Sequence, residues 1–264
     1  MTRRQLLPLL LGGFGAASCT RKGGGPHKLR VGVTPVPAGE IMAQVAPALA
    51  RDGVGVEIVT FSDYILPNLA LASGDLDANL YQHVPFMQQF NRDHNTRFVA
   101  VTRVALTPMA LYPGRSKSLA TLPDGAILAV PNDPVNLGRS LLLLQTVNLL
   151  RVDAKAGAAA TLHDIVSNPR HLQFRELEAA QLPRSLPDVD AAIVNGNYAL
   201  DSGLNPIRDG LVREAADSPY VNVLAVNSGN ETDPRVRALA RVLTSQETRH
   251  FIEDRYQGAV FAAF

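Results

Sequence analysis

Residues 130–144 read Val130-Pro-Asn-Asp-Pro-Val-Asn-Leu-Gly-Arg-Ser-Leu-Leu-Leu-Leu144. This stretch predicts the end of a strand, a tight turn and a new helix, because Asp133 can cap the helix and Pro134 suits its first turn. Free backbone N–H groups and the positive end of the helix dipole would face outward there, with Asn136 and Arg139 on one side. Such a helix start can hold a small anion, for example a carboxylate. An ordinary capped helix with a surface arginine fits the stretch equally well.

Strands and helices alternate in the first part of the chain. The apolar patterns predict strands at residues 29–34, 54–60, 76–80 and 98–104, with helices at 41–50, 67–73 and 85–94 between them. This alternation is typical of a mostly parallel sheet covered on both faces. Tyr64 follows one strand and Tyr81 and His83 follow another, at the edge where open α/β sheets bind ligands.

The alternation restarts after an extended segment with two prolines at residues 106–113. Strands are predicted at 126–130, 172–176 and 190–194, a long helix at 134–150, and a further helix after the capping-box pattern at Thr161. A second extended run at 219–226 predicts a return crossing, followed by helices at 234–243 and 246–256. The sequence therefore predicts an α/β clamshell with two crossover strands, in which residues 28–108 and 222–264 form one lobe and residues 109–221 the other.

The N-terminus has the pattern of an export signal. Basic residues at Arg3 and Arg4 precede a short apolar run, which ends in small residues directly before Cys19, the single cysteine of the chain. This order predicts a signal peptide at residues 1–18 and a lipidated Cys19, followed by a glycine-rich tether at 19–27. The position three residues before the cysteine is Ala16, where the usual lipobox prefers leucine. The first residues also resemble a twin-arginine signal, so Sec and Tat export both remain open.

Composition and motifs exclude several classes of function. The 264 residues carry 25 basic and 24 acidic side chains, so no nucleic-acid surface is expected. The six histidines show no paired metal-ligand spacing, and no metal or cofactor is expected. Ser140 lacks the nucleophile-elbow pattern, and the chain contains neither a P-loop nor a G-x-G-x-x-G after a strand. We therefore expect a binding protein rather than an enzyme.

Several blocks of the chain together resemble the NlpA lipoprotein family, whose members include the methionine-binding lipoproteins of ABC importers. The resemblance covers the chain from Leu29 onward in the same order. Its most specific part is the block at residues 131–144, and the other blocks are residues 75–79, 82–83, 177–186 and 218–222. The resemblance implies a two-lobe periplasmic-binding-protein clamshell of the type II-like kind, which agrees with the architecture predicted above.

The resemblance also implies a ligand and a set of contacts. The implied ligand is methionine, of either hand, held by a monomer on a lipid anchor outside the cytoplasmic membrane and delivered to an ABC transporter permease with its ATPase. Arg139 would grip the ligand carboxylate, and Asn136 and Asn195 would hydrogen-bond its carboxylate and ammonium. The side chains implied to enclose the thioether are Tyr64, Tyr81, His83 and Phe86. Guanidinium, amide and aromatic groups suit these roles.

Two departures from the family pattern leave the ligand open. Many relatives carry His-Ala where this chain has Ala38-Gly39, and proline where it has Ala180. A pocket-lining histidine at the first position would make another amino acid, or a dipeptide that contains methionine, the ligand here. A clamshell enzyme and a purely structural envelope lipoprotein are the alternatives from other classes.

Overall fold

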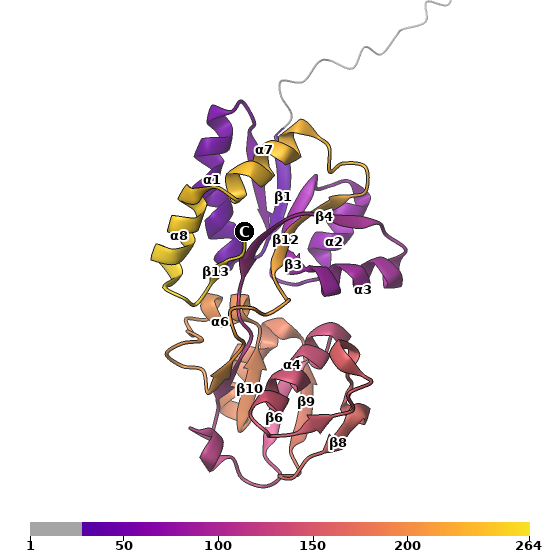
Figure 1. Cartoon of the computed structure of the whole chain (residues 1–264), viewed down its shortest axis with the longest axis vertical. Helices are drawn as coiled ribbons and strands as arrows, with labels where there is room; N and C mark the ends of the chain where they lie inside the picture. Colours follow the sequence, from indigo (N-terminus) through magenta and orange to yellow (C-terminus); the bar gives the residue numbers. More distant parts are fainter. Residues whose placement is uncertain (1–27) are drawn as a thin grey trace, which may run out of the picture.

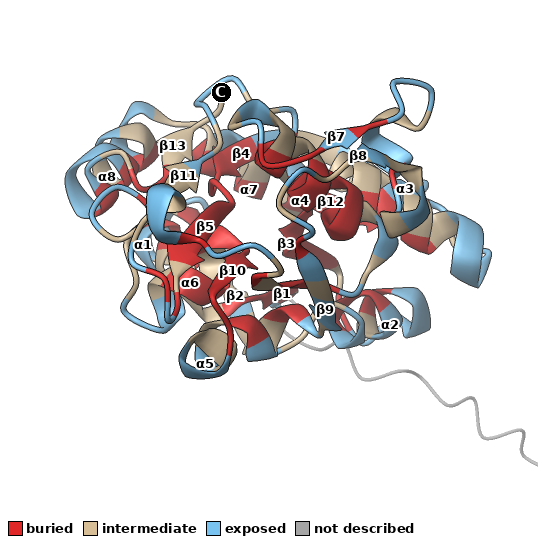
Figure 2. Ribbon diagram, turned by 90° about the horizontal axis from the view of Figure 1, so that it is seen from below, coloured by how far each residue is buried: buried red, intermediate tan, exposed pale blue. Residues whose placement is uncertain are grey.

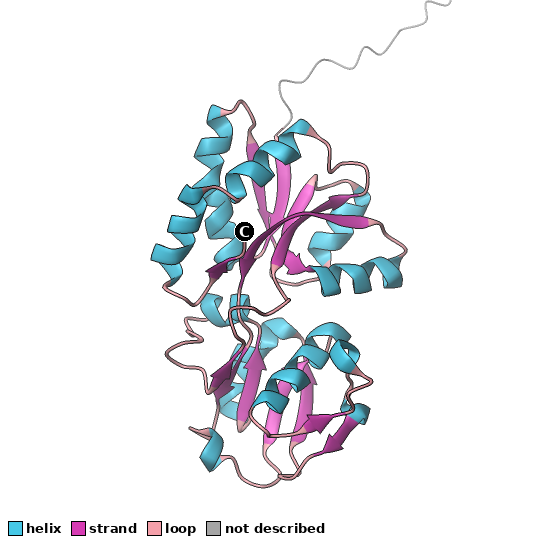
Figure 3. Ribbon diagram, in the orientation of Figure 1, coloured by secondary structure: helices cyan, strands magenta, loops and turns pink. Residues whose placement is uncertain are grey.

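The computed structural model describes residues 28–264 and shows two α/β lobes, one above the other in Figure 1. The chain passes from the first lobe to the second and back again, through two adjacent segments at the junction (Figure 3). The predicted signal peptide, the predicted lipidation of Cys19 and the predicted tether at 19–27 lie outside the described residues. Within residues 28–264, no helix is both long enough and apolar enough to cross a membrane.

The first lobe contains a six-stranded sheet of the order β13-β4-β12-β3-β1-β2. Its strands are β1 (Leu29–Val33), β2 (Val56–Thr60), β3 (Ala78–His83), β4 (Phe98–Leu106), β12 (Asn222–Asn227) and β13 (Phe261–Ala262). The pairs β1–β2 and β1–β3 are parallel, as alternation predicts. Strand β4 runs in the same direction as these three, but the sheet as a whole is mixed, because β12 returns from the second lobe and enters antiparallel between β3 and β4.

Helices cover both faces of this sheet, so its central strands β1, β3 and β12 are largely buried (Figure 2). The helices are α1 (Glu40–Arg51), α2 (Leu66–Ser73), α3 (Val84–His94), α7 (Pro234–Leu243) and α8 (Gln246–Tyr256). On one face, Met42 of α1, Leu239 of α7 and Ile252 of α8 pack in one apolar cluster. On the other face, Leu71 of α2 and Phe90 of α3 form a second cluster with strand residues. The apolar stripes at helical spacing thus build the core of the lobe.

The second lobe contains a five-stranded sheet of the order β11-β5-β10-β6-β9 and a two-stranded sheet, β7–β8. The strands are β5 (Ala110–Pro113), β6 (Ile127–Pro131), β7 (Arg151–Val152), β8 (Ile165–Ser167), β9 (Gln173–Leu177), β10 (Ala191–Val194) and β11 (Val212–Arg213). Helix α4 (Pro134–Thr146) covers one face, and α5 (Leu182–Ser185) and α6 (Gly196–Asp201) lie on the other. Strand β6 leads directly into α4, so the stretch at residues 130–144 forms the expected strand, turn and helix.

Two helix predictions in this lobe are wrong in extent. Helix α4 ends at Thr146 rather than at residue 150, because Asn148 adopts a left-handed conformation with φ of 57°. The capping box at Thr161 does form, but it starts only the 3₁₀ turn Leu162–Asp164. The β-branched residues Ile165 and Val166 follow and enter β8, since such side chains favour strands over helices.

The two crossings bring the ends of the lobes together. Residues 107–109 connect β4 in the first sheet to β5 in the second, and residues 214–221 connect β11 back to β12. Gly196, at the start of α6, lies so close to the first crossing that a Cβ atom there would be 2.5 Å from the carbonyl oxygen of Pro108. Glycine is required at this approach. The division into residues 28–108 with 222–264 and residues 109–221 stays a prediction.

Candidate functional site

A cavity lies between the lobes, beside the two crossings, with about 350 Å³ of space not occupied by protein atoms, a figure that includes open solvent. Residues from both lobes line it: Tyr64, Tyr81, Gln82, His83, Phe86, Thr107, Asn136, Arg139, Asn195, Gly196, Asn197 and Asn222. Every residue that the sequence assigned to a binding site therefore lines the same cavity.

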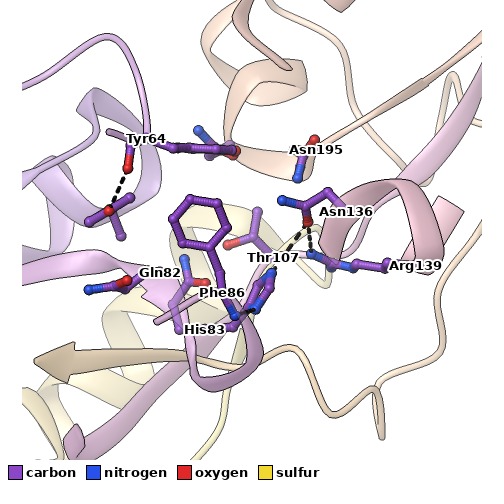
Figure 4. Close-up of a pocket in the computed structure, with 12 residues that line it drawn as sticks. Tyr64, Gln82, His83, Phe86, Thr107, Asn136, Arg139 and Asn195 are labelled. Atoms are coloured by element: carbon purple, nitrogen blue, oxygen red, sulfur yellow. Dashed lines mark hydrogen bonds between the residues drawn. The ribbon is translucent and has the colours of Figure 1, made fainter. Parts of the chain in front are cut away.

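The secondary structure explains why these residues meet. Tyr81 and His83 lie at the carboxyl end of β3, and Phe86 lies in the first turn of α3, which follows at once. Asn136 and Arg139 lie in the first two turns of α4, and Asn195 directly follows β10. Strand ends from two sheets thus face one another across the junction (Figure 4).

The start of α4 differs from the sequence expectation in one respect. The side chain of Asp133 caps the helix, with Oδ1 accepting from the backbone N–H of Asn136 at 2.9 Å. Both carboxylate oxygens also accept from the Asn136 side-chain amide, at 3.1 and 3.0 Å. The protein's own carboxylate therefore lies where the sequence predicted free N–H groups for an anion. Burial raises the pKa of Asp133.

A chain of polar contacts runs across the cavity from the first lobe to the second (Figure 4). Nδ1 of His83 accepts from the backbone N–H of Phe86 at 3.3 Å, so the ring proton is on Nε2, which donates to Oδ1 of Asn136 at 3.3 Å. The same oxygen accepts from Nη1 of Arg139 at 3.5 Å. Burial and the nearby Arg139 charge lower the pKa of His83 to about 3. His83 is therefore neutral at physiological pH.

Arg139 is held from behind by a residue that sequence reasoning missed. Its Nε and Nη2 donate to the two carboxylate oxygens of Glu214, at 2.6 and 2.5 Å. The ring of Tyr220 covers the guanidinium, with Cζ 4.5 Å from the ring centroid. Glu214 lies in the return crossing, far from α4 in sequence, and no local motif marks it. The Nη1 edge of Arg139 is left to face the cavity.

Aromatic rings form the first-lobe wall of the cavity. The ring of Phe86 meets the rings of Tyr64, Tyr81 and His83 edge to face, with centroids 5.8, 6.4 and 6.2 Å away. The hydroxyl of Tyr81 donates to the backbone oxygen of Tyr64 at 2.7 Å. Burial raises the pKa of both tyrosines, so both hydroxyls stay protonated. Such ring edges provide favourable contacts for a polarisable apolar group.

A buried amide network supports this wall from beneath. Asn68 and Gln82 exchange two hydrogen bonds, at 2.9 and 2.8 Å, and Gln82 also donates to Oδ1 of Asn79 at 2.9 Å. Asn79 in turn donates to Oδ1 of Asn68 at 2.8 Å. The network joins α2 to β3 and fixes the end of β3 on which Tyr81 and His83 lie.

Two buried polar atoms at the cavity have no hydrogen-bond partner, the hydroxyl of Thr107 and Oδ1 of Asn195. Their residues are 7% and 4% exposed, and both line the cavity, where Figure 4 labels them. Such buried polar groups are rarely left unpaired in native proteins. Asn222, which begins β12 and also lines the cavity, lies in a block quoted for the family resemblance but was not assigned to the site. Its position at a strand end is the signal that could have identified it.

Two hydrogen bonds join the loop before α2 to α6 across the junction. The hydroxyl of Tyr64 in the first lobe donates to Oδ1 of Asn197 in α6 at 2.5 Å. In return, the hydroxyl of Tyr198 in α6 donates to the backbone oxygen of Ser62 at 3.0 Å. The structure therefore holds the lobes in a closed arrangement around the cavity.

The departures at Ala38 and Gly39 lie away from the cavity. Ala38 is buried in the apolar cluster of the first lobe, and neither residue is among those that line the site. Ala180 instead lines an open hollow at the outer edge of the junction, together with Ile65 and Glu178. Residues 38–39 therefore form no part of the cavity wall in this structure.

No cluster of three or more His, Cys, Asp or Glu side chains within residues 28–264 is placed to hold a metal ion. The groups that the cavity does present are a guanidinium, five side-chain amides, an imidazole, the Thr107 hydroxyl and the rings and hydroxyls of two tyrosines with the ring of Phe86. This set can bind a small molecule that carries both charged and apolar groups.

Proteins that are similar to this chain in sequence and structure include methionine-binding proteins. The D-methionine-binding lipoprotein MetQ of Escherichia coli is 43% identical over 242 residues, which cover 90% of this chain and 89% of the relative. The solved structure of a nutrient binding protein from Burkholderia cenocepacia bound to methionine is 41% identical, with a TM-score of 0.87, over 89% of this chain and all of that one.

A periplasmic substrate-binding protein of an ABC transporter from Coxiella burnetii is 40% identical, with a TM-score of 0.85, over 89% of this chain and all of that one. The model of the NlpA lipoprotein family matches residues 29–264. The match spans both lobes and both crossings. The chain therefore belongs to the NlpA lipoprotein family.

Proposed function

We propose that this protein is a solute-binding lipoprotein that captures methionine in the interlobe cavity and delivers it to an ABC transporter permease. The ligand would lie between the walls, with its charged end at Arg139 and Asn195 and its thioether among Tyr64, Tyr81 and Phe86. This orientation follows from the chemistry of the two walls. The contacts of each end are argued in turn below.

The observation that carries the proposal is the pair of unpartnered polar atoms, Oδ1 of Asn195 and Oγ1 of Thr107. An unpaired buried polar group costs about 1–3 kcal/mol. A ligand ammonium has three N–H donors and can supply both atoms with a partner. Asn222, at the same cavity, offers a further acceptor. Binding of an amine at this position would thus remove an existing cost as well as add contacts.

Arg139 supplies the complementary group for a carboxylate. Two of its nitrogens are engaged by Glu214, but Nη1 makes only a long contact, 3.5 Å, to Asn136. Asn136 itself is already engaged by Asp133, His83 and Arg139. We therefore assign the carboxylate grip to Arg139, with Asn136 orienting it rather than serving as an equal ligand contact.

The first-lobe rings suit the remaining part of the ligand. A thioether packs well against ring edges at about 5 Å, and burial of a methionine side chain stabilises a complex by about 1.5–3 kcal/mol. Micromolar affinity corresponds to about 8.2 kcal/mol after association costs of at least about 4 kcal/mol. Several contacts from both walls are thus needed at once, and the bonds from Tyr64 to Asn197 and from Tyr198 to Ser62 support a closed bound state.

The cellular setting of the proposal draws on the family. Members named as methionine-binding lipoproteins and as a periplasmic substrate-binding protein of an ABC transporter support a membrane-attached protein on the extracytoplasmic side. Cys19 would carry the lipid. The protein would act as a monomer, with a permease and its ATPase as partners, and would carry out no reaction on the ligand.

Calorimetric titration of the protein, unfolded and refolded to remove co-purified ligand, tests the proposal. We expect micromolar or tighter binding of L- or D-methionine, and weaker binding of alanine, which lacks the thioether. A panel of other amino acids and of methionine dipeptides serves as the comparison. Absence of binding to both enantiomers, with no shift in melting temperature, would contradict the function.

The variant Asn195→Ala sharpens this test. Since Oδ1 of Asn195 has no partner in the free protein, its removal should weaken methionine binding about tenfold or more while leaving the melting temperature of the ligand-free protein unchanged or raised. A drop in free-protein stability without a loss of affinity would contradict the assigned role of Asn195.

A further inference from the structure

Glu214 lies directly behind the guanidinium of Arg139, on the side away from the cavity. The two side chains form a two-point ion pair, with Nε and Nη2 donating to Oε1 and Oε2 at 2.6 and 2.5 Å. Their side chains are only 4% and 9% exposed. Arg139 lines the cavity and Glu214 does not. The carboxylate can therefore influence a ligand through its charge and through Arg139, without touching it.

The position of the Glu214 charge is fixed by the backbone. The N–H of Glu214 donates to the carbonyl oxygen of Met109 at 3.0 Å, and the N–H of Met109 donates back to Oε2 of Glu214 at 2.8 Å. Met109 lies in the first crossing and Glu214 in the second. The carboxylate is thus tied to both segments that join the lobes, beside the cavity, and has little freedom to move.

The pair leaves the buried wall electrically balanced. Arg139 contributes one positive and Glu214 one negative charge, and His83 is neutral. Asp133, which caps α4, can add only negative charge, so the wall carries no excess of positive charge. A ligand with a carboxylate and an ammonium brings no net charge to this wall. A ligand with a carboxylate alone would bring an uncompensated negative charge into a buried site, which is unfavourable.

We propose that Glu214 determines the charge class of the ligand. By neutralising Arg139 from behind, it makes the cavity select a zwitterionic amino acid over a carboxylate anion of the same shape. The inference rests on the proposed function, since it concerns the same site, and it names Glu214 as a specificity-determining residue that acts through Arg139.

Replacement of Glu214 by glutamine should shift the relative affinities of two matched ligands in a predictable direction. Glu214→Gln keeps the shape of the side chain but leaves Arg139 as an uncompensated positive charge. L-methionine and 4-(methylthio)butanoate share the carboxylate and the thioether, so any displacement of Arg139 affects both. They differ in the ammonium, which the added positive charge repels. The ratio of the two affinities must then shift toward the acid, by about tenfold or more for an ammonium within about 10 Å.

The experiment measures the dissociation constants of both compounds, by direct and competition calorimetry, for the unmodified protein and for Glu214→Gln. We expect the unmodified protein to prefer methionine and the variant to shift the ratio at least about tenfold toward the acid. Glu57→Gln removes a negative charge from an exposed position in the first lobe and serves as the matched control, with no change in the ratio. A ratio that stays within about twofold in Glu214→Gln would overturn the inference.

A second variant covers the case in which Glu214→Gln does not fold. Glu214→Asp keeps the charge but shortens its reach, so both affinities should fall while their ratio stays close to that of the unmodified protein. A shift of the ratio toward the acid in Glu214→Asp would overturn the inference. If the unmodified protein binds neither enantiomer of methionine, the proposed function fails. If the protein binds methionine but the ratio of the two affinities does not respond to the charge at position 214, only the role of Glu214 is contradicted.

Discussion

The two walls of the cavity differ in how complete they are without a ligand. In the first-lobe wall, Phe86 already contacts the rings of Tyr64 and Tyr81, and a closed amide network lies beneath. In the second-lobe wall, Oδ1 of Asn195 has no partner and one edge of Arg139 makes only a long contact. The second-lobe wall, called the polar wall below, should therefore supply most of the affinity. The first-lobe wall, called the aromatic wall, should select the side chain of the ligand.

The largest effect expected from this difference is that of Arg139→Ala. Loss of the charge-assisted hydrogen bond from Nη1 to the ligand carboxylate, about 1.5–3 kcal/mol, should weaken methionine binding about tenfold to a hundredfold. Removal of the guanidinium also leaves Glu214 buried and unpaired, which should lower the free energy of unfolding by about 3–5 kcal/mol. Calorimetry and chemical denaturation measure the two effects.

Arg51→Ala, at an exposed position on α1, is the matched control for Arg139→Ala and should change neither quantity. If a folded Arg139→Ala protein binds methionine within threefold of the unmodified affinity, Arg139 does not bind the ligand carboxylate. The comparison of the walls would then be wrong.

A smaller effect is expected at His83, where the two walls meet. Burial lowers its pKa from 6.5 to about 3, so the unfolded chain takes up a proton below pH 6.5 that the folded protein does not. Stability is therefore fully present above pH 6.5 and falls as the pH decreases toward 3, by about 2 kcal/mol between pH 6.5 and 5. Denaturation curves of the protein and of His83→Gln at both pH values isolate this contribution.

The same argument predicts that protonation of His83 does not control binding between pH 5 and 8. Methionine affinity should be flat over that range, because the ring stays neutral in the folded protein. A loss of affinity on acidification from pH 8 to 6, absent in His83→Gln, would show that the ring is charged in the cavity.

The smallest effect is expected for Tyr64→Phe. The ring stays in the aromatic wall, but the hydrogen bond to Asn197 across the junction is lost. Since a neutral hydrogen bond contributes about 0.5–1.5 kcal/mol, methionine affinity should fall about twofold to tenfold. Tyr256→Phe, which loses a contact to Glu40 within the first lobe, is the control and should leave affinity unchanged. Equal losses of methionine affinity in both variants would show that the hydrogen bond across the junction makes no specific contribution to binding.

Local patterns predicted the individual elements better than their pairing. The strand, turn and helix at residues 130–144 form as expected, because Asp133 and Pro134 determine the helix start locally. The position of β12 between β3 and β4 has no local signal, since it depends on a chain that returns from the other lobe. The 3₁₀ turn after Thr161 differs from the prediction because the β-branched residues that follow override a helix start.

The site residues show the same difference between positions that local patterns predict and positions that depend on long-range packing. Every residue that the family resemblance assigned to the site lines the cavity, and most of these residues lie at strand ends or helix starts. Glu214 and Thr107 come from the crossings and Asn222 from the start of β12, where only the packing of the lobes determines which side chains meet. The free helix start predicted as an anion site is instead capped by Asp133, which the sequence also offered as the cap.

Crystallographic location of the ligand tests the assignment of the two walls most directly. The protein, with its own methionines containing sulfur, is crystallised with free selenomethionine, and the anomalous signal of selenium is measured. We expect the selenium peak among the rings of Tyr64, Tyr81 and Phe86, with carboxylate density at Arg139. A selenium peak beside Arg139 or Asn195, or outside the cavity, would contradict the account.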